Sequence, residues 1–225
     1  MSSPHTDLAA ARAGLYGWLA GVLGRMPDAE LAAALHPDAM EPLLRALSRM
    51  SAPAAQEAAA ALRRSVDELA AAPGGHAALI ERWAIDRTRL MRQTPGKHLP
   101  PPYESLYKKH SKGKEDSSVI LAVQTFYRQL DICPQDACEA PDFLPMELDF
   151  LAALCRAEAK AEEAEAARLR AAGKAFLSRH VGAWAAEYCK QALVEAKTDL
   201  FRAVLLLLPE ILALDEKFLE ETQAV

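Results

Sequence analysis

The segments PPPYESLY, residues 100–107, and EAPDFLPMELDFL, residues 139–151, interrupt a chain that otherwise shows the periodicity of amphipathic helices. Three consecutive prolines open the first of them, which we call the proline-run segment. Because proline fixes φ and lacks a backbone donor, these residues must be extended and cannot join a helix. In the second, the acidic-turn segment, Pro141 sets a turn before a helical pattern resumes. The two segments therefore mark where irregular connections are expected between blocks of helix.

The composition of the chain favours helix over sheet. Of its 225 residues, 51% are apolar and 25% are charged, which is typical of a globular protein with a substantial core. Alanine dominates the apolar fraction, whereas Val, Ile and Thr are scarce. Alanine loses no side-chain entropy in a helix, while β-branched residues do. We therefore predict an all-α fold.

Apolar periodicity and helix start and stop signals divide the chain into about ten helices. The expected helices cover residues 6–23, 27–35, 38–50, 53–72, 76–91 and 116–130, followed by a mainly helical stretch from about residue 143 onward. Within that stretch, breaks are expected near Gly173, at Val181-Gly182 and at Lys197-Thr198. We predict a single domain over residues 1–225, in which an N-terminal half (about 1–92) and a C-terminal half (116–225) are joined by a long irregular loop (93–115).

The cysteines, the N-terminus and the apolar runs indicate a reduced, soluble protein. Cys133, Cys138, Cys155 and Cys189 match no common zinc-ligand spacing and are read as reduced thiols, although a disulfide between the first two is geometrically conceivable. No basic region followed by an apolar stretch opens the chain. The longest apolar run, residues 203–214, is interrupted by proline and is too short to span a bilayer. We expect a cytoplasmic location.

The charge distribution gives little reason to expect nucleic-acid binding. The formal net charge is −5, although residues 82–114 carry nine basic side chains against two acidic ones. Such a basic segment is suited to steering the chain towards an acidic partner surface. The alternative is that these side chains form an ordinary solvated face.

Both irregular segments resemble a known family. The Pro-Pro-Tyr-x-Ser-x-Tyr pattern at residues 101–107, and the Glu-x-Pro-Asp turn at residues 139–142 that opens a Glu-Leu-x-Phe helix, resemble the TorD/DmsD/NarJ family of redox-enzyme maturation chaperones. A later Phe-x3-His-x3-Trp pattern, residues 176–184, is also similar. Family members carry a His after the Asp of the turn, and here that residue is Phe143. No role that needs an imidazole is therefore carried over.

The resemblance implies an all-α, cytoplasmic, system-specific chaperone without enzymatic activity. Such proteins bind the leader peptide or the apo form of a molybdopterin-containing oxidoreductase, and assist cofactor insertion and assembly before export through the twin-arginine pathway. Client leaders carry two adjacent arginines and then an apolar segment, so their receptor needs carboxylates and an apolar groove. The resemblance leaves the client open, and it allows a monomer or a domain-swapped dimer.

Carboxylates and apolar side chains are both present in the two segments, which we expect to converge in space. The predicted peptide-binding residues are Tyr103, Glu104, Ser105, Leu106, Tyr107, Glu139, Pro141, Asp142 and Phe143. In this hypothesis Glu104 offers a carboxylate at the lip of a groove that is lined by Tyr103, Leu106 and Phe143.

Several of these side chains have structural alternatives. The two tyrosines, Tyr107 above all, are suited to filling the core, where a buried hydroxyl finds a hydrogen-bond partner. Asp142 is well placed to cap the helix that begins near residue 144. His180 lies in a stripe with Phe176, Trp184 and Tyr188 at every fourth residue, and there it is more typical of a hydrogen-bonded core residue than of a ligand.

The sequence lacks the constellations that catalysis would need. It contains no Glu-x-x-His pairs for a helical di-metal site and no phosphate-binding loop. His180 and Cys189, nine residues apart, would face different sides of a helix. We therefore predict no enzymatic activity, no metal and no cofactor. The alternative function is a non-catalytic helical adaptor or scaffold that uses the basic residues 82–114.

Overall fold

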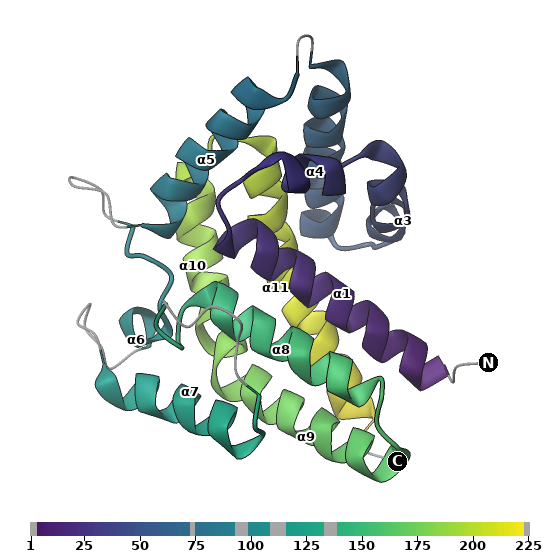
Figure 1. Ribbon diagram of the computed structural model, residues 1–225, viewed down its shortest axis with the longest axis vertical. Coiled ribbons are helices and arrows are strands. Elements are labelled where there is room, and N and C mark those ends of the chain that lie inside the picture. Colours follow the sequence, from purple (N-terminus) through teal and green to yellow (C-terminus); the bar gives the residue numbers. More distant parts are fainter. Residues whose placement is uncertain (1–3, 73–74, 93–98, 109–115, 133–138, 223–225) are drawn as a thin grey trace. The chain divides into compact units, whose positions relative to one another are not determined.

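The computed structural model describes residues 4–72, 75–92, 99–108, 116–132 and 139–222, and the regular elements of these residues are all helices (Figure 1). The eleven helices in the described residues are α1 (Pro4–Gly24), α2 (Ala29–Ala34), α3 (Pro37–Ser48), α4 (Pro53–Ala71), α5 (Ala77–Met91), α6 (Glu104–Tyr107), α7 (Ser117–Gln129), α8 (Leu144–Glu158), α9 (Glu163–Arg179), α10 (Val181–Glu195) and α11 (Asp199–Glu221). The predicted all-α class is confirmed.

The helices group into two compact units, and each unit is assembled from segments that are distant in sequence. The first unit contains residues 1–24, 102–186 and 212–225, and the second contains residues 25–101 and 187–211. Helices α10 and α11 therefore contribute residues to both units. The expectation of one domain over residues 1–225, with its two halves and a connecting loop at 93–115, stays a prediction.

Local capping signals explain where several helices begin. The Asp28 carboxylate accepts a hydrogen bond from the Leu31 N–H at 2.9 Å and starts α2. The Asp116 carboxylate does the same for α7 through the Ser118 N–H at 3.0 Å. Both satisfy backbone donors that the first turn of a helix leaves unpaired.

The later helix breaks were predicted in part. Breaks occur at residue 180 and at residues 196–198, close to two of the predicted positions. The break expected near Gly173 is wrong, because this residue lies inside α9, where helical packing overrides the weak helix propensity of glycine. A break at residues 159–162, which carries no Gly or Pro, was not predicted.

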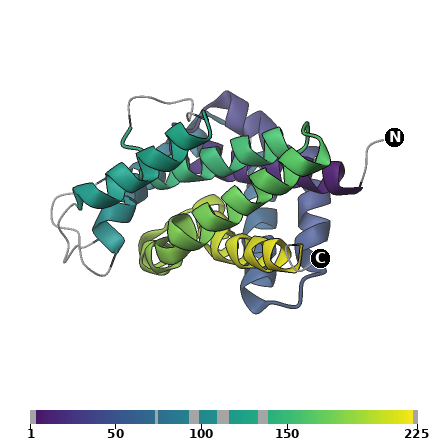
Figure 2. The ribbon, with the colours of Figure 1, turned by 90° about the horizontal axis from the view of Figure 1, so that it is seen from below.

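The core of the first unit forms where α1 lies along α8 and α8 lies along α9 (Figures 1 and 2). The α8 side chains Met146, Phe150 and Leu154, which recur every fourth residue on one face of the helix, are buried. Gly24 ends α1 beside the start of α8, and a Cβ at this position would lie 3.0 Å from the Cβ of Pro145. The missing side chain therefore allows the two helices to approach closely.

A buried ion-pair network joins the three sequence-distant segments of the first unit. Arg12 on α1 binds both carboxylate oxygens of Asp215 on α11, at 2.5 and 3.1 Å, and binds Glu158 on α8 at 2.7 Å. The Tyr16 hydroxyl donates a further hydrogen bond to Asp215 at 2.7 Å. Bidentate geometry and low exposure make this pairing stronger than a surface ion pair.

In the second unit, the buried carboxylate of Asp86 on α5 fixes the start of α11. Its Oδ2 accepts hydrogen bonds from the N–H of Lys197 at 2.9 Å, from the N–H of Thr198 at 2.7 Å and from the Thr198 hydroxyl at 2.8 Å. Arg89 pairs with the other oxygen at 3.0 Å. Asp86, 112 residues from Thr198 in sequence, therefore caps α11 in place of a neighbouring side chain.

The aromatic stripe of residues 176–188 is buried, and the helix break expected near Val181-Gly182 divides it between α9 and α10. Helix α9 ends at Arg179, and His180 has φ −117° and ψ −108°, after which α10 begins at Val181. Phe176, His180 and Trp184 belong to the first unit and Tyr188 to the second. The His180 ring still packs against that of Phe176, with a centroid distance of 4.9 Å.

Two further observations concern thiols and membrane helices. Cys155 and Cys189 are free and buried, and Cys133 and Cys138 lie outside the described residues. Burial raises the pKa of the Cys155 thiol to about 12, which makes this side chain an inert part of the core. Among the described residues, none of the helices combines the length and the apolar character needed to cross a bilayer.

Candidate functional site

The proline-run segment and the acidic-turn segment lie directly against each other in the first unit. The Glu104 N–H donates to the Asp142 carbonyl at 2.9 Å, and the Leu144 N–H donates to the Pro102 carbonyl at 2.9 Å. These two hydrogen bonds form an isolated antiparallel bridge between Tyr103 and Phe143. The expected convergence of the two segments is therefore observed.

Asp142 links the two segments a second time, through its side chain. Its Oδ2 accepts a hydrogen bond from the Ser105 N–H at 3.0 Å, so Asp142 caps the short helix α6. The prediction that Asp142 caps the following helix is wrong, because the N-cap of α8 is Phe143, whose side chain makes no cap bond. The other carboxylate oxygen of Asp142 is buried and has no hydrogen-bond partner.

Aromatic contacts reinforce the bridge. The rings of Tyr103 and Phe143 lie 5.0 Å apart between centroids, in a tilted arrangement. The Tyr103 hydroxyl donates to the Glu139 carboxylate at 3.1 Å, and the Tyr127 hydroxyl on α7 donates to the Pro141 carbonyl at 2.8 Å. At the position where the resembled family carries a histidine, Phe143 therefore packs an apolar ring against Tyr103.

The nine predicted site residues separate into a buried frame and a partly exposed face. The frame consists of Glu104, Ser105, Asp142 and Phe143, each at most 1% exposed. The face consists of Tyr103, Leu106, Tyr107, Glu139 and Pro141. The expectation that Glu104 stands at the lip of a groove is wrong, as is the expectation that Phe143 lines it, because neither reaches the surface.

Glu104 is the centre of a buried polar cluster. Both of its carboxylate oxygens lie within hydrogen-bonding distance of His180 Nδ1, at 2.9 and 3.1 Å. Lys108 Nζ lies 2.5 Å from Oε1 and also donates to the Arg179 carbonyl at 2.9 Å. The interpretation of His180 as a hydrogen-bonded core residue agrees with this geometry.

A second carboxyl group, that of Glu147 on α8, lies beside Glu104. The Trp184 indole N–H donates to Glu147 Oε2 at 3.1 Å, and Tyr107 covers the indole with a centroid distance of 5.4 Å. A charged residue of an amphipathic helix is expected on the solvent face, but Glu147 has no exposed surface.

The surroundings of the two glutamates move their pKa values in opposite directions. Burial raises the pKa of Glu104, but hydrogen bonds with His180, Glu147 and Lys108 outweigh burial, so the pKa lies below its ordinary value. Burial and the negative charge of Glu104 hold the pKa of Glu147 well above its ordinary value. Of the two buried carboxyl groups, that of Glu104 is therefore the more readily ionised.

Sequence reasoning missed Glu147, Lys108, His180 and Trp184 as parts of this site. A signal for Glu147 does exist, because Leu144 and Leu151 lie three and four residues from it on the same face of α8, and both are buried. No local signal points to Lys108 and His180, since their roles depend on Glu104, which lies on another segment.

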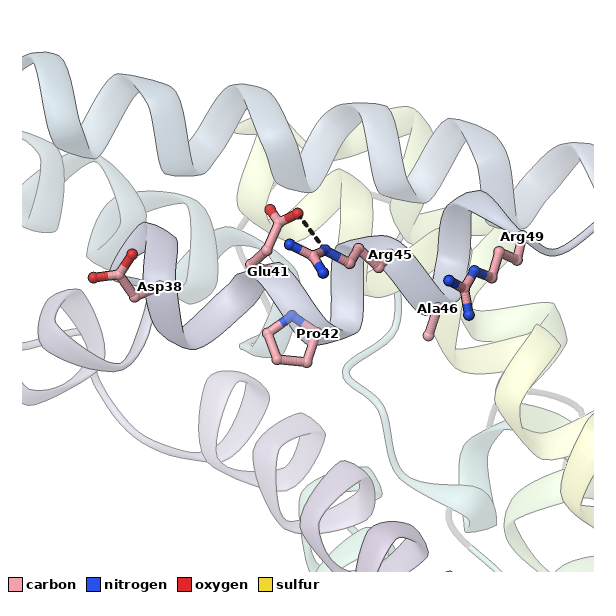
Figure 3. Close-up of a pocket in the computed structure, with 6 residues that line it drawn as sticks. All are labelled: Asp38, Glu41, Pro42, Arg45, Ala46 and Arg49. Carbon is pink, nitrogen blue, oxygen red and sulfur yellow. Dashed lines mark hydrogen bonds and ion pairs between the residues drawn. The ribbon is translucent and has the colours of Figure 1, made fainter.

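Other parts of the described structure offer less defined sites. A hollow of about 560 Å³ on α3 is lined by Asp38, Glu41, Pro42, Arg45, Ala46 and Arg49 (Figure 3). Its charged side chains are largely exposed, and Arg45 is already paired with Glu41 at 2.8 Å. In the residues that the structure describes, no group of three or more His, Cys, Asp or Glu side chains is arranged to hold a metal ion.

Comparison with known proteins identifies the family. Residues 51–190 match the family model described as "Nitrate reductase delta subunit", and no curated protein matches the chain. The matched range covers more than half of the chain and contains both segments as well as His180. The resemblance to the TorD/DmsD/NarJ chaperones is thereby confirmed. The chain therefore belongs to the nitrate reductase delta subunit family, a family of molybdoenzyme maturation chaperones.

Proposed function

We propose that this protein is a cytoplasmic chaperone that binds the leader peptide and the apo form of a molybdopterin-containing oxidoreductase, and that it assists cofactor insertion and assembly before export. It acts by binding and not by catalysis. The observation that carries the proposal is the bridge between Tyr103 and Phe143, which joins the two segments into one body. The family match supports the general class of function and of partner.

The chemistry of the partly exposed face suits a leader of paired arginines followed by apolar residues. Glu139 presents a carboxylate that the Tyr103 hydroxyl orients, and an ionised carboxylate accepts several hydrogen bonds. A guanidinium group pairs well with such an acceptor. Tyr103, Leu106 and Pro141 supply apolar surface beside it. In this proposal Asp142 and Glu104 hold the face in place from inside and do not touch the peptide.

Internal pairing of the basic residues favours the chaperone over an adaptor that uses residues 82–114. Within the described part of that segment, Arg82 pairs with Glu68, Arg89 pairs with Asp86, and Lys108 pairs with Glu104. Arg87 is buried and contacts the Met26 sulfur at 3.4 Å. These side chains are engaged within the protein, which leaves less positive charge for a nucleic acid or an acidic surface.

Titration of the full chain with a fluorescent synthetic leader peptide tests the proposal. The peptide carries an arginine pair and an apolar segment, and a second peptide replaces both arginines with glutamine. We expect Tyr103→Ala to weaken binding about tenfold, as for an aromatic anchor, and Glu139→Gln to weaken it less than about fivefold, as for an exposed ion pair. The glutamine peptide should bind wild type weakly and should lose the response to Glu139→Gln.

The matched control is Arg45→Ala on α3, which should leave the affinity unchanged. Unchanged affinity in both site variants would refute the proposed face. A mobility-shift assay with nucleic acid at low salt addresses the adaptor alternative, since salt-sensitive binding there, without peptide binding, would favour it.

A further inference from the structure

The two carboxyl groups of the buried cluster around Glu104 differ in the number of basic side chains that contact them. Glu104 and Glu147 both have no exposed surface. Glu104 is matched by Lys108 at 2.5 Å and by His180 at 2.9 Å. Glu147 has no cation among the contacts described here; the Trp184 indole reaches one of its oxygens, and the other is buried with no donor beside it. A buried carboxylate with such surroundings is strongly disfavoured, whereas a protonated carboxyl group is not.

The position of Glu104 supplies the missing partner for that proton. The structure places the two carboxyl groups beside each other: Glu104 binds His180, Glu147 binds Trp184 four residues later, and the bridge between Tyr103 and Phe143 joins the segments that carry them. Two ionised carboxylates repel each other and have no hydrogen to share, so the pair is more stable when one of them carries a proton. Lys108 and His180 hold Glu104 in its ionised form, which leaves the proton on Glu147.

We propose that the proton shared by Glu147 and Glu104 locks helix α6 in place, and that its loss to solvent loosens α6 and weakens peptide binding. This inference rests on the proposed function. Glu104 is the first residue of α6, Tyr103 precedes it, and Leu106 and Tyr107 complete the helix. When Glu147 releases its proton to water, a second negative charge appears beside Glu104, and the repulsion acts on the element that carries most of the partly exposed face.

The other charged and titratable groups around this pair come from three elements. Asp142, in the turn before α8, adds to the negative field at Glu147. Burial and the surrounding carboxylates, with Asp149 on α8 the weakest of them, raise the pKa of Tyr127 on α7, so this phenol stays neutral. Lys108 and His180 are the positive or potentially positive groups, and both of them bind Glu104 rather than Glu147.

Two measurements on the full chain, each taken from neutral into alkaline pH, test the inference. One is the hydrogen-exchange protection of the Ser105 and Leu106 amides, corrected for the intrinsic exchange rate, and the other is the affinity for the arginine-pair peptide. We compare wild type with Glu147→Gln, which keeps the shape and the hydrogen bonds of a protonated glutamate. Asp149→Asn, on the same helix but half-exposed, is the matched control.

In wild type, protection of α6 and peptide affinity should both fall as the pH rises, the affinity by up to about tenfold per pH unit above the apparent pKa of the pair. In Glu147→Gln both should stay flat, and Asp149→Asn should behave as wild type. If Glu147→Gln responds to pH as wild type does, the inference is wrong.

Two results separate this inference from the proposed function. If no peptide binds at any pH while the protection of α6 falls with rising pH, the proposed function is wrong and the inference about the shared proton is supported. If the peptide binds but neither its affinity nor the protection of α6 depends on pH, the proposed function is supported and the inference about the shared proton is wrong. Should Glu147→Gln not fold, infrared spectra of wild type still decide, because the C=O band of a protonated carboxyl group must be present at neutral pH and must vanish at alkaline pH.

Discussion

The carboxylate of Asp142 accepts a hydrogen bond of 3.0 Å from the backbone N–H of Ser105, so the acidic-turn segment caps the helix that follows the proline run. The Asp of the family turn therefore has a structural task that is complete without a ligand. Because α6 has only four residues, it depends on such contacts from outside more than a long helix does.

Replacing Asp142 with alanine should destabilise the protein by about 1–2 kcal/mol, the usual range for a lost helix cap. Asn keeps an acceptor oxygen of the same shape, so Asp142→Asn should lose less. Urea unfolding followed by circular dichroism measures the free energy of unfolding of each variant. Equal losses in the alanine and asparagine variants would show that charge, and not the cap, is what matters here.

Arg12 should be among the most sensitive positions in the first unit. Arg12→Ala leaves Asp215 and Glu158 buried without their main partner, which typically costs about 3–5 kcal/mol. Lysine cannot reproduce the bidentate contact, so Arg12→Lys should restore only part of the loss. The exposed pair of Arg25 with Glu30 provides a control, and Arg25→Ala should change the free energy of unfolding by less than about 1 kcal/mol. A small loss in Arg12→Ala would contradict the network.

Two glycines should respond to alanine in opposite directions. A Cβ on Gly182 would lie 2.7 Å from the carbonyl oxygen of Leu177, a backbone atom that cannot easily move, so Gly182→Ala should destabilise by about 1–3 kcal/mol. At Gly173, inside α9, a Cβ meets nothing within 4 Å, and alanine should stabilise by about 0.5–1 kcal/mol. Thermal unfolding of both variants checks the pair, and a stabilising Gly182→Ala would show that the α9–α10 junction is less constrained than described.

The stability of the wild-type protein should fall with rising pH because of Glu147. The pKa of this group is raised in the folded state, so the folded state holds a proton that the unfolded state releases above about pH 4.3. Stability therefore decreases from that pH up to the folded-state pKa, by at most about 1.4 kcal/mol per pH unit from this group. Glu147→Gln should remove this component and be more stable than wild type at neutral pH. Chemical denaturation across the pH range measures the difference, and an unchanged pH dependence would refute it.

Much of the fold could be predicted because its signals are local. Asp28 and Asp116 start helices through hydrogen bonds to donors two or three residues away, and such patterns are visible in any sequence. The convergence of the two irregular segments could be proposed, although on the strength of the family resemblance.

The features that could not be predicted depend on contacts between residues far apart in the sequence, which local spacing does not indicate. Asp86 fixes the start of a helix 112 residues later, and Glu147 is buried beside Trp184 and Glu104, which lie on other segments of the chain. The predicted roles of Glu104 and Phe143 were wrong for the same reason. Each was assigned to the surface from its residue type and local position, while contacts from other segments place both inside.

The ion pair between Arg12 and Asp215 spans 203 residues of sequence and closes the first unit. A nascent chain emerging from the ribosome therefore cannot finish this unit until nearly its last helix has been synthesised. Until then the buried side of α1 has no complete set of neighbours, and no short expression fragment will reproduce the unit. In a protein proposed to guard unfinished enzymes, the first unit is therefore itself completed only after α11 has been synthesised.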